Sequence, residues 1–227
     1  MSAELVRRPT QSESSQCHFY PWVGPAYQAG AIDGLRILVL GESHYTYPGL
    51  TEANERTLTC RVIEEEFEEV RKHRFISAVT TVLFGRDAAR DKEQFREHWN
   101  RLAFYNFVQE LAGSGSNHRR SSEAAWGRSV APFRWLLSQL QPDMVLACGR
   151  TLYERLKLVD GLTSEPLYGD DARRSRSRLL EVAGGHPAVL GMIHHPASRH
   201  FTAREWRPFV QKYLDRARAV RARYAAA

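Results

Sequence analysis

The chain has 227 residues, 43% of them hydrophobic, which suits one α/β domain with extensions and excludes a chain too polar to build a core. Its formal net charge is +6 with arginine dominating the basic residues, a balance that favours polyanionic partners such as nucleic acid without deciding the function. Three scattered cysteines without a Cys-x-x-Cys pair argue against disulfides, structural zinc and iron–sulfur clusters, and no apolar run approaches the roughly 18 residues of a membrane span, so we expect a soluble, cytoplasmic protein.

The N-terminal residues 1–30 are predicted to form an extension, and residues 31–227 a single domain. Within the extension, the aromatic residues and prolines at 19–27 predict an ordered irregular segment that packs on the domain. Apolar periodicity then predicts, in chain order, a strand at 35–40, a helix at 57–72, a second apolar patch at 74–84 that could open another helix, a helix at 95–99, a strand at 102–108, a helix at 132–140, a strand at 143–149, a helix at 151–158, a strand at 188–193 and a closing helix at 206–223.

Strands alternate with helices through this series, so we expect an α/β fold with a mostly parallel sheet and helices on both faces. Residues 113–122 are predicted to form a loop by composition. Residues 170–178 carry four arginines among aspartates and serines and predict a mobile, solvated loop, with phosphate contact as the second interpretation.

Polar side chains follow three of the predicted strands. The first strand ends in Gly41-Glu42-Ser43-His44-Tyr45, the strand near 102 reaches Asn106, and the last is followed by residues 194–200. Because the carboxyl ends of parallel strands meet at one edge of a sheet, we expect these side chains to surround a single cleft. Pro196 holds the residue before it in an extended conformation, so the His195 imidazole should project from its loop.

This combination resembles the uracil-DNA glycosylase superfamily over roughly residues 35–215. The superfamily has a first motif such as Gly-Gln-Asp-Pro-Tyr or Gly-Glu-Ala-Pro-Gly where residues 41–45 stand here, and a last motif related to His-Pro-Ser where residues 195–198 stand. The resemblance implies a three-layer α/β/α fold with a central, mostly parallel four-stranded sheet.

The resemblance also implies roles for individual residues. Gly41 would let the backbone approach the ligand and Glu42 would position or activate water at the sugar C1′, while Ser43 and His44 take the place of the family's usual proline-containing pair. The remaining roles are a pocket floor at Tyr45, a base-reading amide at Asn106, stabilisation of the departing base by His195, and contacts to the phosphodiester by Ser198 and Arg199.

Elementary chemistry supports the same reaction. Hydrolysis of an N-glycosidic bond develops positive charge on the sugar and negative charge on the base, which a carboxylate (Glu42) and an imidazole (His195) would stabilise. The base must leave its stack first, so an aromatic wall is expected. Tyr47, Phe75 and Phe84 are candidates, and Phe75 is preferred because it follows the basic run 71–74. The expected activity is therefore that of a DNA N-glycosylase, a hydrolase of DNA repair acting on uracil or another damaged base.

Two other chemistries stay open at this point. His44, His194, His195 and His200 with Glu42 could bind zinc, although adjacent histidines on an extended segment point to opposite faces. A nucleophilic Ser43–His195 pair, oriented by Glu42 or Asp170, is the second, although the Gly-x-Ser-x-Gly elbow is absent. We expect neither a metal nor a cofactor.

The alternative from another class is a non-catalytic module that binds a nucleotide or nucleic acid on the same fold. Ser43-His44 and Ala197, which replace the residues usual in the family, favour this alternative. For either function we expect DNA as the partner, including single strands, no membrane, and a monomer.

Overall fold

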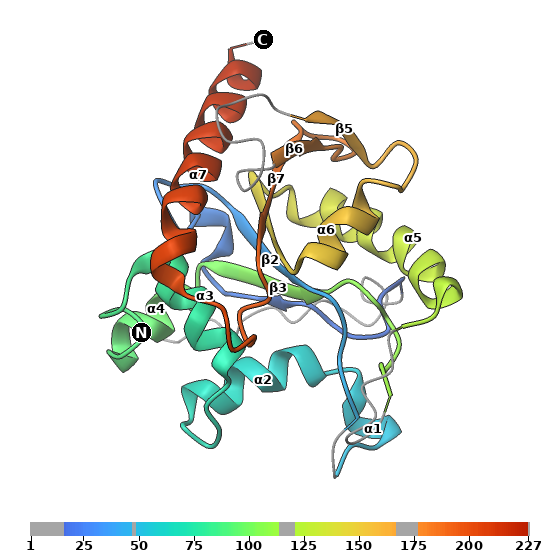
Figure 1. Cartoon of the computed structure of the whole chain (residues 1–227), viewed down its shortest axis with the longest axis vertical. Helices are drawn as coiled ribbons and strands as arrows, with labels where there is room; N and C mark the ends of the chain where they lie inside the picture. The colour runs from blue at the N-terminus through green and yellow to red at the C-terminus, as the bar shows by residue number, and fades with distance from the viewer. Residues whose placement is uncertain (1–15, 47–48, 114–120, 167–176, 227) are drawn as a thin grey trace, which may run out of the picture.

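The computed structural model describes residues 16–46, 49–113, 121–166 and 177–226 (Figure 1). It is an α/β structure built on one seven-stranded sheet in the order β1-β3-β2-β4-β7-β6-β5. The predicted class is therefore confirmed.

The four central strands are parallel to one another. Every residue in them is buried, which explains their continuous apolar sequences, because a parallel sheet covered on both faces has no solvent side to mark with polar residues. These strands are β2 (Ile37–Gly41), β3 (Leu102–Asn106), β4 (Met144–Cys148) and β7 (Ala188–Ile193).

Three further strands extend the sheet beyond the four that were expected. At one edge β1 (Trp22–Val23) pairs antiparallel with β3. At the other edge β6 (Ser177–Leu180) pairs antiparallel with β7, and β5 (Thr163–Pro166) pairs antiparallel with β6. The expected four-stranded sheet is thus only the centre of a mixed one. The outer strands have two to four residues, too short for a period-two pattern to stand out in the sequence.

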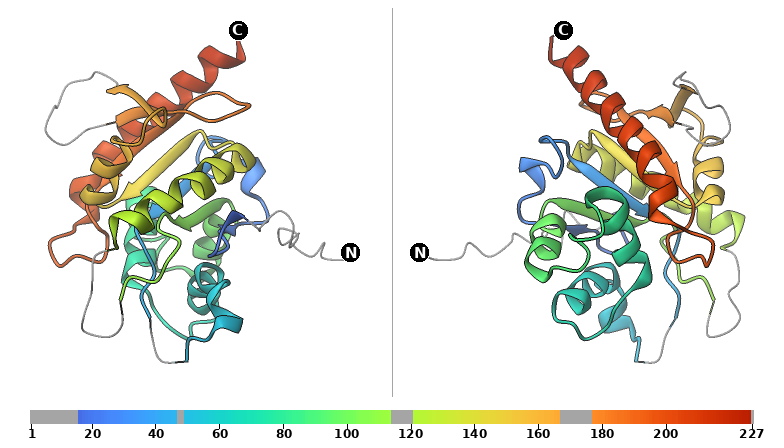
Figure 2. Two further views of the ribbon diagram at one scale, coloured as in Figure 1. Left: turned by 90° about the vertical axis from the view of Figure 1, so that its right-hand side faces the viewer. Right: turned by 60° about the vertical axis from the view of Figure 1, so that its left-hand side comes forward.

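Helices cover both faces of the sheet. Figure 2 shows α7 and α3 on one side and α5 and α6 on the other, and both α6 and α7 pack against β4 and β7. Within the described residues, no helix combines the length and the apolar character needed to cross a membrane. The α-helices are α1 (Glu52–Glu55), α2 (Leu58–Phe67), α3 (Arg74–Phe84), α4 (Lys92–Trp99), α5 (Glu123–Leu140), α6 (Arg150–Leu156) and α7 (Ala203–Ala225), and a 3-10 helix, η2, spans Tyr27–Ala29.

Two helix boundaries differ from their predictions for local reasons. The helix predicted from residue 132 begins at Glu123, because the Ser122 hydroxyl accepts a hydrogen bond from the Ala125 amide and caps a new first turn. Pro132 therefore lies inside α5 rather than at its start. The helix predicted to reach residue 72 ends at Phe67, shortly before Glu69 adopts a left-handed backbone conformation (φ 57°).

The segment assigned to the N-terminal extension is part of the packed domain from residue 17 to residue 30. It supplies β1 and places Cys17, Phe19 and Tyr27 in the core with almost no exposed surface. The Phe19 amide also donates a hydrogen bond to the side chain of Gln109, beyond β3. These contacts tie the segment to the sheet over long sequence separations.

Helix α7 packs closely on the last parallel strand. The ring of Tyr213 occupies the space beside Gly191 of β7, where an added Cβ would come within 2.3 Å of the ring, and its hydroxyl donates to the Met192 carbonyl at 3.0 Å. A glycine is required here because any side chain would push the helix off the strand.

Candidate functional site

The candidate site starts where β2 ends, and the chain after Gly41 stays beside the sheet. It continues beside the extension of β3, since the amides of Phe107 and Val108 donate to the carbonyls of Gly41 and Glu42, and the Ala112 amide donates to that of His44. These bonds hold the loop against the carboxyl edge of the sheet.

Gly41 and Asn106 face each other across β2 and β3 in the strand register. A Cβ at position 41 would lie 2.0 Å from Asn106 Oδ1, so the amide occupies the space that a side chain would need. The backbone of Gly41 has no positive φ. Glycine is therefore needed for the close approach of Asn106 and not for a turn.

His44, expected to touch substrate, is buried and contacts three other elements of the site. The Asn106 amide nitrogen lies 3.1 Å from its Nδ1 and 3.0 Å from its Nε2, and Nε2 also lies 2.8 Å from the Thr59 hydroxyl of α2. The Phe19 ring packs edge-on against the imidazole at 4.9 Å. Burial lowers the pKa of His44 from 6.5 to about 3, so the imidazole is neutral at physiological pH.

A neutral His44 explains how Asn106 is oriented. The Asn106 amide nitrogen lies within hydrogen-bond distance of both ring nitrogens, so in either neutral tautomer the unprotonated nitrogen can accept from it. Asn106 keeps its second N–H and its Oδ1, a donor and an acceptor side by side. Its backbone carbonyl accepts from the Gln109 side chain at 2.8 Å, which also anchors the strand end.

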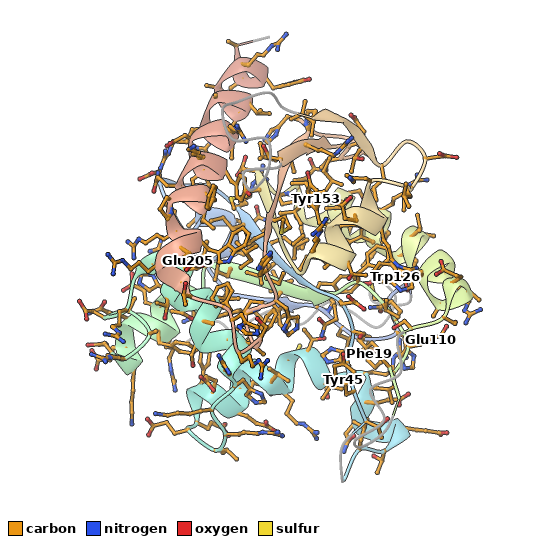
Figure 3. The ribbon with its side chains drawn as sticks, viewed as in Figure 1. Phe19, Tyr45, Glu110, Trp126, Tyr153 and Glu205 are labelled. Atoms are coloured by element: carbon orange, nitrogen blue, oxygen red, sulfur yellow. The ribbon has the colours of Figure 1, made fainter. Side chains whose placement is uncertain are left out.

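The other side chains of the loop are more accessible than His44. Glu42 and Ser43 are half-buried, and Tyr45 is 46% exposed. In the view of Figure 3, Tyr45 and Phe19 lie near one another at the lower end of the molecule, with α2 close by.

The second half of the site follows β7. His195 is solvent-exposed as a residue, while one side of its ring meets the Phe75 ring of α3 at a centroid distance of 5.7 Å. This partial burial lowers the pKa of His195 below its ordinary value. The ring of His194, the exposed neighbour, lies instead against Trp206 of α7.

The loop after His195 is held by its own backbone and by α3. The Ser198 amide donates to the His195 carbonyl, and the Arg74 guanidinium donates to the Ser198 carbonyl at 3.0 Å. Arg199 is exposed, and its Nε lies 3.0 Å from Nε2 of His200. The Ser198 and Arg199 side chains, expected to hold a phosphodiester, thus lie on an ordered turn at the surface.

Phe104 connects the two halves. Its ring packs on Phe75 at 5.5 Å and also borders the space beside Gly41. Phe104 and Asn106 are two positions apart on β3, so both side chains lie on the same face of the strand. Asn106, Phe75 and His195 are therefore grouped over one face of the sheet at its carboxyl edge.

The two alternative chemistries find little support in this geometry. Among the described residues, no group of three histidine, cysteine, aspartate or glutamate side chains is placed to hold a metal ion. In the described part of the chain, no hydrogen bond joins Ser43 to His195. Asp170, the other suggested orienting residue, and Tyr47, a candidate for the aromatic wall, lie outside the described residues.

Three contributors escaped the sequence reasoning, namely Phe19, Thr59 and Phe104. Phe104 could have been found, because its position two residues before Asn106 on a strand places it on the same face. Phe19 and Thr59 carry no such signal, since their contact with His44 depends on how distant segments pack.

No family model matches this chain, and no curated protein matches it.

Proposed function

We propose that this chain binds an unpaired base of DNA at the carboxyl edge of the sheet and hydrolyses its N-glycosidic bond. The observation that supports this most is the grouping of Asn106, Phe75 and His195 over one face of the sheet, with Glu42 on the loop beside them. Together they are an amide, an aromatic surface, an imidazole and a carboxylate.

Asn106 would recognise the edge of the base. Its remaining N–H and Oδ1 match the adjacent acceptor and donor of a pyrimidine or deaminated purine edge. The contact with His44 prevents the amide from rotating freely, which keeps donor and acceptor in one order. This pre-orientation lowers the entropy lost on binding.

His195 would stabilise the departing base as a neutral hydrogen-bond donor. Its lowered pKa keeps the imidazole uncharged near pH 7, with one N–H available to a developing oxyanion. We therefore expect base release to persist as the pH falls below 6.5, and to decline only when the imidazole takes up a second proton. A reaction that required the imidazolium would show the opposite trend, increasing toward acid pH.

Glu42 would act at the sugar. A carboxylate there stabilises the positive charge that develops as the bond breaks, and it can orient the attacking water. Phe75 and Phe104, packed together at 5.5 Å, would form the apolar wall that receives the base once it has left its stack.

Single-turnover base release tests the proposal directly. Single- and double-stranded oligonucleotides carrying uracil or hypoxanthine are incubated with the parent protein, Glu42→Gln, His195→Ala and, as the matched control, His194→Ala. We expect each of the first two changes to lower the rate about 100-fold or more, and the control to leave it near the parent value.

A second function, binding without cleavage, is favoured by one contact. The Asn106 amide already donates to His44, so part of its base-reading capacity is used inside the protein. Binding of the same oligonucleotides without release, unchanged by Glu42→Gln, would support this module and contradict the hydrolase.

A further inference from the structure

A cleft of about 680 Å³ lies between α3 and the start of α7. It is distinct from the group at the carboxyl edge, because neither Glu42, Asn106 nor His195 lines it. Four arginines and the hydroxyls of Ser77 and Thr81 are part of its wall; the arginines are Arg74, Arg86, Arg204 and Arg207.

Among the described residues no carboxylate lines this cleft, although the Glu66 carboxylate accepts a hydrogen bond from the Ser77 hydroxyl at 3.0 Å. No carboxylate among the described residues forms an ion pair with any of the four arginines. Glu205, exposed in the first turn of α7 and labelled in Figure 3, does not line the cleft. Other arginines are neutralised, as Arg128 is by Glu110 and Arg155 by Glu123.

Four uncompensated guanidinium groups around one cavity repel each other, and an anion between them removes that cost. Arginine forks donate two parallel hydrogen bonds to phosphate oxygens. The arginines supply these donors, because the Ser77 hydroxyl already donates to Glu66 and the Thr81 hydroxyl to the Ser77 carbonyl. One arginine is enough for a carboxylate, whereas four arginines match the charge and the several oxygens of phosphate groups.

We propose that this cleft binds phosphate groups of a nucleic-acid strand or of a small nucleotide. Pro196, which follows His195, lines the cleft, so a strand that places a base at the carboxyl edge would have backbone phosphates within its reach. The inference goes beyond base release and does not require it, because phosphate binding involves no chemical step.

A pair of matched double variants isolates the cleft. Arg86→Ala with Arg204→Ala removes two of its charges, and Arg90→Ala with Arg223→Ala removes two charges elsewhere. All four arginines are exposed, and none of their side chains forms a hydrogen bond or ion pair in the described structure, so both double variants should keep the parent melting temperature.

Binding is measured by fluorescence anisotropy with an undamaged single-stranded oligonucleotide over a range of salt concentrations, and by calorimetry with inorganic phosphate and a nucleoside monophosphate. We expect the cleft variant to bind the oligonucleotide about tenfold or more weakly. The slope of log K against log salt should become shallower by about 1.4, since each of the two lost phosphate contacts on a single strand contributes about 0.7. The control variant should retain nearly all of the affinity and the slope.

The source of the phosphate follows from which probe is affected. Loss of oligonucleotide binding in the cleft variant alone identifies a nucleic-acid strand, and loss of phosphate and nucleotide binding with unchanged oligonucleotide binding identifies a small ligand. Equal losses in the two double variants, or a parent protein that binds none of the probes, would overturn the proposal. If the protein releases no base but the cleft variant binds the probes more weakly than the control variant, the hydrolase proposal is wrong and the phosphate-site proposal is supported.

Discussion

Gly41, His44 and Asn106 depend on one another at the scale of single residues. Gly41 leaves the space that the Asn106 amide occupies, and His44 accepts from that amide. Because all three are buried, a change in one is transmitted to the others.

Replacement of Gly41 by alanine tests this dependence. The new Cβ would overlap Asn106 Oδ1, so the amide must rotate away and lose His44. We expect a destabilisation of about 1–3 kcal/mol in urea unfolding, together with weaker base binding.

The matched control is Gly127→Ala in α5, where a Cβ meets nothing within 4 Å. It should be neutral or slightly stabilising, because alanine favours the helix. Equal destabilisation by both changes would mean that the contact between Gly41 and Asn106 does not contribute to the free energy of unfolding.

His44 makes the stability depend on pH. Its pKa is about 3 in the folded protein and 6.5 ordinarily, so between these values the unfolded chain binds more protons. The free energy of unfolding should therefore fall as the pH drops below 6.5, by up to about 1.4 kcal/mol per pH unit from this residue.

The comparison for this prediction is His44→Gln, which keeps a neutral polar partner for Asn106. Urea midpoints at pH 7 and pH 5 should differ less in the variant than in the parent protein. An identical difference in both proteins would show that His44 is not the titrating group.

Asp143 joins several elements at the amino ends of the parallel strands. Its fully buried carboxylate accepts from the Arg36 backbone amide at 2.7 Å, lies 3.0 Å from His186 Nε2, and lies 3.8 Å from Nη1 of Arg221 in α7. Asp143 precedes β4, while Arg36 and His186 precede β2 and β7, so one side chain fixes the starts of three strands against a helix.

Removal of this carboxylate should lower the free energy of unfolding substantially. Asp143→Ala leaves the charges of Arg36 and Arg221 without a buried partner, and we expect a loss of about 3–5 kcal/mol in denaturant unfolding. Asp215→Ala, which breaks an exposed pair with Arg218, should change the midpoint little. A small effect of both substitutions would show that the strand starts are held by the sheet alone.

Prediction of elements from the sequence succeeded where burial is complete. The apolar runs of β2, β4 and β7 predicted strands because both of their faces are covered. The end of α2 was missed because its last polar turn continues the helical pattern while the backbone at Glu69 does not. The ends of helices thus depend on local backbone geometry, which the spacing of apolar residues does not predict.

At the scale of the whole molecule, removal of the N-terminal segment tests where the domain begins. A chain that starts at residue 31 lacks β1 and the buried side chains of Cys17, Phe19 and Tyr27, so β3 becomes an exposed edge. We expect this shortened protein to unfold or aggregate, as judged by circular dichroism and gel filtration.

A chain that starts at residue 16 keeps every described contact of the segment and should retain the parent melting temperature. Cooperative unfolding of the shorter chain at the parent temperature would place the domain boundary at residue 30 after all.

The apolar pattern of this chain was sufficient to identify the α/β class, the four parallel strands and the polar residues that follow three of them, because burial on both faces leaves a local signature. The partners of those residues were decided by the tertiary structure. His44 and Asn106 are 62 positions apart and meet through the register of β2 with β3, while Phe75 reaches His195 through the packing of α3 beside α7. Strand order and helix packing bring such pairs together, and neither leaves a mark on the spacing of residues along the chain.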